Sequence, residues 1–212
     1  MLEIFNASHS VLPSFRTFHL DSNVNAASIS AAQVRWFNQT ARALAARAQS
    51  AALLFFHIPL EEYDAAARSG AAMSGHWNEK VSYQPVSSGL FDALHAQGDV
   101  KATFCGHDHT NDFCVGHHGV QLCYEGSPGY QAYGKIGWAR RARVTELRQW
   151  GSEVWSWKRL DDAALSRIDM ELLWQSSGGS SVERVGERRR PSRITSHDAL
   201  PHRSQNELRP TV

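Results

Sequence analysis

Two apolar runs, each followed directly by histidine, constrain the fold of this chain more than any other feature of its sequence. The first run is Ala51–Phe56, which ends at His57. The second is Val100–Cys105, which leads into the motif Gly-His-Asp-His at residues 106–109. Continuous apolar runs of this length are typical of buried strands in an α/β sheet. Because ligands of open α/β sheets bind at the carboxyl ends of the strands, we expect the histidines after the two runs to converge.

The three histidines that follow these runs, His57, His107 and His109, are predicted to bind metal. Imidazole nitrogens suit borderline metals such as zinc and iron. Gly106 permits a close backbone approach and a positive φ at the bend. A bend lets both histidines of the motif turn toward one ion, whereas a regular strand would only point both rings to one face.

The elements around these runs read as helices and strands of a mixed fold. Phe15–Leu20 is predicted to be a short strand, and a helix is expected to begin at Ser30, with Gln33 completing a capping box. An apolar stripe at three- and four-residue steps predicts that this helix covers a sheet. The stripe consists of Val34, Phe37, Ala41, Leu44 and Ala48.

The second half of the chain reads as further strands. Segments 112–115 and 120–124 flank Gly116-His117-His118-Gly119 and predict a β-hairpin whose histidines lie at its tip, far from the metal loop. Segments 138–147 and 153–158 are predicted to be strands, with Arg140, Arg141 and Arg143 on a solvated or edge face.

Two other groups leave alternatives open. Glu61 and Glu62 could be general acids, but adjacent carboxylates here are more typical of the solvated first turn of a short helix. The long connection Ser69–Ser88 is a candidate binding loop, in which His76 and Trp77 either touch a substrate or are ordinary loop residues.

The three cysteines do not indicate whether the protein resides in an oxidising or a reducing cellular compartment. Cys114 and Cys123 lie on facing arms of the expected hairpin and could form a disulfide, which would leave Cys105 unpaired.

Composition excludes several classes of protein. With 212 residues, 42% hydrophobic content and a net charge of +1, the chain is neither a strongly basic nucleic-acid binder nor an acidic tail protein, and no apolar run approaches a membrane span. Its composition changes near Gln175, so Ser176–Val212 is predicted to be a disordered tail rich in Ser, Gly and Arg. The cluster Arg188-Arg189-Arg190 in this tail could contact polyanions.

Three segments together resemble a known family. LFFHIPLEEY, then FCGHDHTNDFC, then LCYEGSPGYQAYGKIGWARRARV are similar to the calcineurin-like metallophosphoesterases, and among them to the purple-acid-phosphatase-like branch of plants and fungi. The resemblance runs from about Phe18 to Trp157 and covers only the C-terminal half of the family domain. It implies that residues 1–175 form a partial domain of α/β (α+β) class, the C-terminal half of a two-sheet β-sandwich flanked by helices.

The resemblance also implies a chemistry. Family members hold two divalent or trivalent metal ions, iron, zinc or manganese, and hydrolyse phosphate monoesters or phosphoproteins. By this resemblance His57 and His107 would bind one metal and His109 the other, while Asp108 would support the turn or the ligands. The Gly-rich loop that follows would lie beside the substrate, or else be a tight crossover to the next strand. Its predicted substrate-binding residues are Gly126, Gly129, Tyr130 and Tyr133.

One departure from the family pattern limits this expectation. No Gly-Asp or Gly-Asn-His block precedes His57, and these blocks supply most carboxylate ligands and the proposed acid in the family. Gly98-Asp99 follows His57 and is not assigned the bridging role. Three neutral imidazoles cannot balance and bridge two divalent metals. We therefore expect a metal-dependent phosphoesterase that is incomplete in this chain and weak or inactive alone. The alternatives are a non-catalytic fragment with a residual histidine site, or an interaction module that uses the basic tail.

Overall fold

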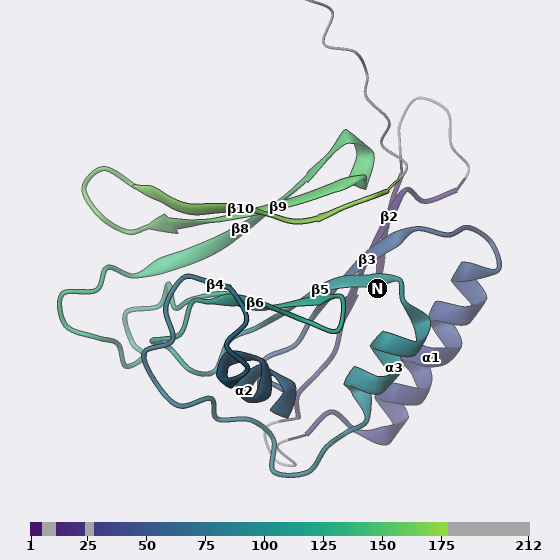
Figure 1. Ribbon diagram of the computed structural model, residues 1–212, viewed down its shortest axis with the longest axis horizontal. Coiled ribbons are helices and arrows are strands. Elements are labelled where there is room, and N and C mark those ends of the chain that lie inside the picture. The colour runs from purple at the N-terminus through teal and green to yellow at the C-terminus, as the bar shows by residue number, and fades with distance from the viewer. Residues whose placement is uncertain (6–11, 24–27, 178–212) are drawn as a thin grey trace, which may run out of the picture. The chain divides into compact units, whose positions relative to one another are not determined.

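Four parallel strands form the centre of a seven-stranded sheet in the computed structural model, which describes residues 1–5, 12–23 and 28–177 (Figure 1). The strand order is β1-β2-β3-β5-β7-β6-β4. The parallel strands are β2 (Phe15–His19), β3 (Ala51–Phe55), β5 (Val100–Cys105) and β7 (Val120–Tyr124). The antiparallel strands at the two sides are β1 (Leu2–Ile4), β6 (Cys114–His117) and β4 (Met73–Ser74). The predicted strands 15–20, 51–56 and 100–105 are thus confirmed to within one residue.

Three helices cover one face of this sheet (Figure 1). They are α1 (Ala31–Ala45), α2 (Glu61–Arg68) and α3 (Leu90–Gln97). Most of the predicted apolar stripe of α1 faces inward: Phe37, Ala41 and Leu44 are buried in the core and Val34 packs against it, whereas Ala48 lies past the end of the helix. None of the helices in the described part of the chain is long and apolar enough to cross a membrane.

The start of α1 confirms the predicted cap and corrects one detail of it. Ser30 Oγ accepts a hydrogen bond from the Gln33 backbone N–H at 3.3 Å, as an N-cap serine should. The Gln33 side chain does not reach back to Ser30, however. Its amide exchanges two hydrogen bonds with the backbone of Asp21, each of 2.8 Å. Gln33 therefore ties the loop after β2 to the helix.

A second, antiparallel sheet covers the other face (Figure 1). It consists of β8 (Arg141–Arg148), β9 (Glu153–Leu160) and β10 (Arg167–Gln175), with a 3-10 turn at Gln149–Gly151. The sequence did not indicate β10, because most of its residues remain half-buried or exposed and no alternation marks a buried face. The core between the sheets includes Phe15, Leu53, Phe104, Val154 and Leu173.

Of the two alternatives for Arg140, Arg141 and Arg143, a solvated face is wrong for Arg141 and Arg143, whereas β8, which begins at Arg141, does lie at the edge of its sheet. Arg141 and Arg143 have side chains that are 3% and 1% exposed. Arg143 donates hydrogen bonds to the carbonyl oxygens of Tyr124 and Asp112, both at 2.8 Å. These guanidinium groups satisfy backbone acceptors between the two sheets, and composition alone does not reveal such partners.

The predicted hairpin is present as β6 and β7, with His118 and Gly119 at its turn. Cys114 and Cys123 pair directly across it and form a disulfide, with Cα atoms 4.1 Å apart. Cys105 is free and buried. Glu61 and Glu62 lie in the first turn of α2, as one of the two readings of that pair expects. Residues 178–212, which carry nearly all of the predicted disordered tail and its arginine cluster, lie outside the described residues.

The packing between the sheets generates a test of the fold. Phe104→Ala should lower the free energy of unfolding by about 3–5 kcal/mol, because the fully buried ring leaves a cavity. Phe5→Ala is the matched control, since that ring is 44% exposed, and it should change stability little. Urea unfolding of the three proteins measures both effects, and equal losses in the two variants would contradict this packing.

Candidate metal site

The three predicted histidine ligands lie at the carboxyl ends of neighbouring parallel strands. His57 follows β3, and His107 and His109 follow β5, which pairs with β3 on one side and β7 on the other. All three contribute to one cleft of about 320 Å³. Its other lining residues come from the segment after β7 and from the start of β8: Glu125, Gly126, Ser127, Pro128, Ala142 and Arg143, together with Gly106.

His57 and His107 are close enough to share one ion. Their ring centroids lie 5.4 Å apart. Two imidazoles bound tetrahedrally to zinc, with Zn–N near 2.0 Å, have centroids about 5 Å apart. The backbone at His57 is fixed by Ser22, whose buried hydroxyl accepts hydrogen bonds from the N–H groups of His57 and Ile58 at 2.9 and 2.8 Å.

The bend before His107 corrects the expected role of Gly106. The positive φ lies at His107, where it is 74°, and not at the glycine. Gly106 instead lets the backbone approach the His57 ring closely, because a Cβ there would lie 3.2 Å from His57 Nδ1. A non-glycine residue with positive φ carries backbone strain, which often marks a functional side chain.

His109 is oriented by Tyr133. The two rings stack with centroids 4.1 Å apart, and His109 Nδ1 lies 3.1 Å from the carbonyl oxygen of Tyr133. Because a carbonyl oxygen only accepts, Nδ1 must carry the hydrogen, which leaves the lone pair on Nε2 for a metal.

Asp108 is buried and already partnered. Its Oδ2 accepts hydrogen bonds from the Tyr124 hydroxyl at 2.6 Å and from the Ser82 backbone N–H at 2.9 Å. These contacts agree with its interpretation as a residue that supports the loop. Burial first, and then the nearby Cys105 and Asp108, raise the pKa of Tyr124, so its hydroxyl keeps the proton that it donates.

The four predicted substrate-binding residues are not equivalent in the structure. Gly126 lines the cleft and lies against Arg141, so a Cβ there would approach Arg141 Cγ to 2.8 Å. Tyr133 contacts His109, as described above. Tyr130 and Gly129 are not among the lining residues, and the Tyr130 hydroxyl donates a hydrogen bond to Asp161. The substrate role of all four stays a prediction.

Electrostatics in the cleft favour the neutral form of His57. Burial, followed by the neighbouring His107 and His109, lowers the pKa of His57. Glu125 provides the carboxylate among the lining residues, and it was not among the residues predicted for the site. Its position directly after β7 was the available signal. Burial raises the pKa of Glu125, while the charge of Arg143 opposes that change.

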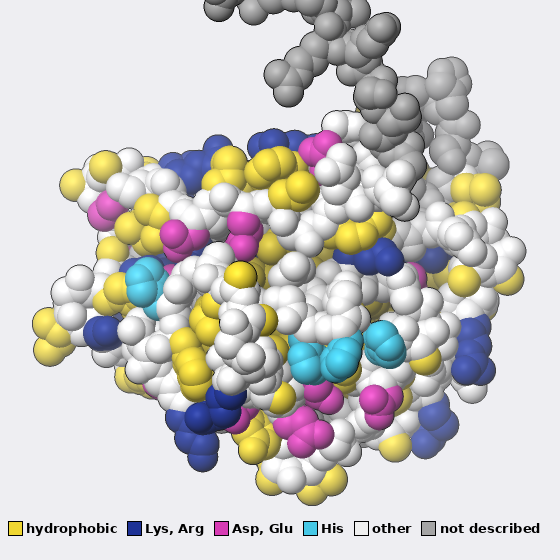
Figure 2. Space-filling view, viewed as in Figure 1, with side chains coloured by type: hydrophobic (Ala, Val, Ile, Leu, Met, Phe, Trp, Pro, Cys, Tyr) yellow, Lys and Arg dark blue, Asp and Glu magenta, His cyan; other side chains and the backbone are white. Residues whose placement is uncertain are grey.

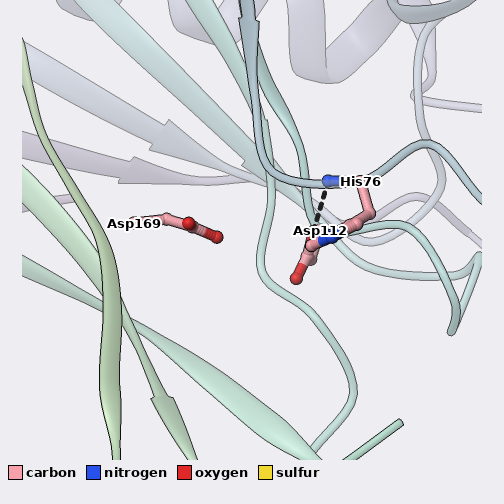
Figure 3. A group of neighbouring side chains, drawn as sticks. All are labelled: His76, Asp112 and Asp169. Carbon is pink, nitrogen blue, oxygen red and sulfur yellow. Dashed lines mark hydrogen bonds and ion pairs between the residues drawn. The ribbon is translucent and has the colours of Figure 1, made fainter.

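A second group of candidate ligands lies apart from these histidines. His76, Asp112 and Asp169 each offer a ligand atom, and these atoms lie within 4.8 Å of one another. Figure 3 shows His76 hydrogen-bonded to Asp112, both in loops, with Asp169 pointing toward them from β10. Such a set of one imidazole and two carboxylates could hold a divalent metal.

Two protein cations already engage these carboxylates. Lys158 Nζ, fully buried, lies 3.1 Å from Asp112 Oδ1 and 2.7 Å from Asp169 Oδ2. Arg141 Nη1 lies 2.8 Å from Asp112 Oδ2. Because a metal would have to displace or oppose these charges, we interpret the group as a buried ion-pair network. His76 thus has a partner within the fold, which favours its reading as a loop residue.

Comparison with known proteins finds relatives among plant and fungal phosphatases. The chain is 41% identical over 174 residues to an Arabidopsis thaliana protein named "Probable inactive purple acid phosphatase 29", a match that covers 74% of this chain and 44% of that protein. It is 44% identical over 131 residues to "Probable inactive purple acid phosphatase 14" of the same plant, covering 58% and 32%. It is 30% identical to "Phosphatase DCR2" of Saccharomyces cerevisiae, covering 61% and 24%.

The protein is therefore related in sequence to proteins named as purple acid phosphatases. More particularly, it is related to the plant proteins named as inactive members of that group and to the fungal protein DCR2. The chain spans less than half the length of these relatives. No protein-family model matches the sequence.

A solved structure of a dimetal phosphatase from Danio rerio is also similar, with 16% identity and a TM-score of 0.46, covering 70% of this chain and 39% of that one. This likeness is too distant to bear on function.

The ion-pair network gives a test that is independent of metal. Burial disfavours the Asp112 carboxylate, but Lys158, the His76 backbone N–H and Arg141 outweigh burial and lower its pKa below 3.8. Asp112→Asn should therefore cost about 3 kcal/mol at pH 7, because it leaves buried cations poorly compensated. Urea unfolding at several pH values measures this cost.

The sign of the pH dependence follows from the lowered pKa. A carboxylate with a depressed folded-state pKa stabilises the fold above its unfolded value, and the stabilisation is lost as the pH falls through the folded value. The difference between wild type and Asp112→Asn should therefore shrink below about pH 4. Glu146→Gln, at a half-exposed pair with Arg148, is the control and should show little change. A pH-independent difference would contradict this assignment.

Proposed function

We propose that the protein uses His57, His107 and His109 to hold a metal ion that faces phosphate esters, and that turnover by these 212 residues is weak or absent. The observation that carries this proposal is the approach of the His57 and His107 rings to 5.4 Å in a cleft that His109 also lines. Homology to purple acid phosphatases supports phosphate monoesters, free or in a phosphoprotein, as the substrate class.

The donor set fits one borderline divalent metal. Three imidazoles suit zinc or iron, the lowered pKa of His57 favours the neutral, ligating form, and the carbonyl partner of His109 fixes its tautomer. A metal bound here would supply a Lewis acid that polarises phosphoryl oxygens. The protein would orient the ester against the wall formed by Glu125, Gly126 and Ser127.

The same donor set fits two metals poorly. Binuclear hydrolases bridge their ions, and carboxylates suit that role. The Asp108 carboxylate is held by Tyr124 and Ser82, so Glu125 provides the carboxylate that lines the cleft. Iron, zinc or manganese in a second position would need further ligands. This supports weak or absent turnover, and two plant relatives carry "inactive" in their names.

A paired metal and activity measurement tests the proposal. The metal-depleted chain should bind zinc, and His57→Ala/His107→Ala should weaken that binding at least tenfold by calorimetry. His19→Ala is the matched control, because this exposed histidine lies on β2 and bonds Thr17 instead. Hydrolysis of p-nitrophenyl phosphate with zinc, iron or manganese should stay near the uncatalysed rate.

The possible outcomes separate the two parts of the proposal. Zinc binding that is unchanged in the double variant would remove the metal site. Rapid hydrolysis by the wild-type chain that disappears in His107→Ala would keep the site and overturn the claim of weak turnover.

A further inference from the structure

A second group of histidines gathers on the surface, away from the cleft at the strand ends. His95 lies in the last turn of α3, while His117 and His118 lie at the turn of the β6–β7 hairpin. Figure 2 shows histidine side chains side by side on this face, with acidic side chains beneath them. A shallow cavity of about 290 Å³ joins the group, and its lining consists of Glu62, Phe91, Asp92, His95, His117 and His118.

Two of the three ring pairs lie near the spacing of a shared ion, and the side chains must rotate for all three rings to reach one. The centroids of His117 and His118 lie 4.4 Å apart, and those of His95 and His118 lie 5.9 Å apart. Two imidazoles on one tetrahedral zinc have centroids about 5 Å apart. Rotation of the exposed His95 and His118 side chains would bring both pairs to that distance. No hydrogen bond engages the ring nitrogens of these three histidines among the described residues.

The backbone explains how two consecutive histidines reach the same side. Successive side chains of a strand point to opposite faces. His118 leaves the strand with a φ of 44°, in the left-handed region, and this turn brings its ring against that of His117. Phe91 packs beneath both rings, with centroids 5.1 and 6.5 Å away, and holds the hairpin tip near α3.

The neighbouring charges favour a cation. Asp92 and His95 are three residues apart on α3 and so lie on one face of the helix. Asp92 and Glu62 both line the cavity, whereas none of its lining residues is a lysine or an arginine. Two carboxylates beside three imidazoles provide the charge that a divalent ion needs.

We propose that His95, His117 and His118 form a separate binding site for a divalent transition metal such as zinc, with Asp92 as the neighbouring carboxylate. This site is independent of the phosphoesterase cleft. The purple-acid-phosphatase relationship does not require it, and it couples the hairpin tip to α3 through the ion.

Zinc titration of the full 212-residue chain tests the site. His95→Ala/His118→Ala should lose one zinc equivalent, or bind it at least tenfold more weakly, while His57→Ala/His107→Ala should retain that equivalent. His19→Ala is again the control for an isolated exposed histidine. On the wild-type chain, zinc should also shift the ring ¹⁵N signals of His95, His117 and His118, a measurement that requires no variant to fold.

Each result decides the question. Loss of one zinc equivalent in His95→Ala/His118→Ala alone, together with shifts of the three ring ¹⁵N signals, supports the site. A zinc isotherm unchanged in that variant, an equal loss in His19→Ala, or ring signals that do not move with added ZnCl₂ would overturn it.

Discussion

The arrangement of the two sheets depends on the ion pairs formed by the buried carboxylate of Asp112. Asp112 follows the loop at residues 106–109 and precedes β6, and it contacts a cation from each of two strands of the second sheet, Arg141 of β8 and Lys158 of β9. Lys158 and Arg143 also donate to its backbone oxygen. Three charged groups of the smaller sheet thus converge on one residue in the loop that leads into β6 of the larger sheet. Such a network is costly to desolvate and tolerable only when every member is paired.

This anchoring also shapes the cleft. Arg143 and Ala142 of β8 form one wall, and the histidines at the ends of β3 and β5 form the other. The parallel register of β3, β5 and β7 brings their carboxyl ends to one edge, so the histidines meet there without a specialised scaffold. Fixing β8 through Asp112 determines how far the two walls lie apart. The site therefore depends on an ion-pair network whose members are not its ligands.

The sequence predicted the central features because they rest on local, repeating signals. The apolar runs before His57 and His107 identified β3 and β5, the stripe through Phe37 and Leu44 identified α1, and Gly119 marked the hairpin turn. Pairing partners far apart in the chain were not predictable in this way.

Two groups of residues illustrate that limit. Arg141 and Arg143 were predicted to lie on a solvated or edge face because charged side chains are mostly exposed. Their acceptors on Asp112 are 29 and 31 residues away in the chain, and no local sequence pattern indicates them. β10 carries little apolar alternation, because only Leu173 of its nine residues is buried. Glu125 likewise lines the cleft because β7 lies next to β5 in the sheet, and this strand order could not be predicted from local sequence.

The short outer strands of the larger sheet carry a further consequence. β1 has three residues and β4 has two, so each side of the sheet offers few unpaired backbone groups to a strand from another molecule. Long, flat sheet margins act as templates for intermolecular β-pairing and fibril growth. These brief margins should therefore help keep neighbouring copies from joining strand to strand at high concentration.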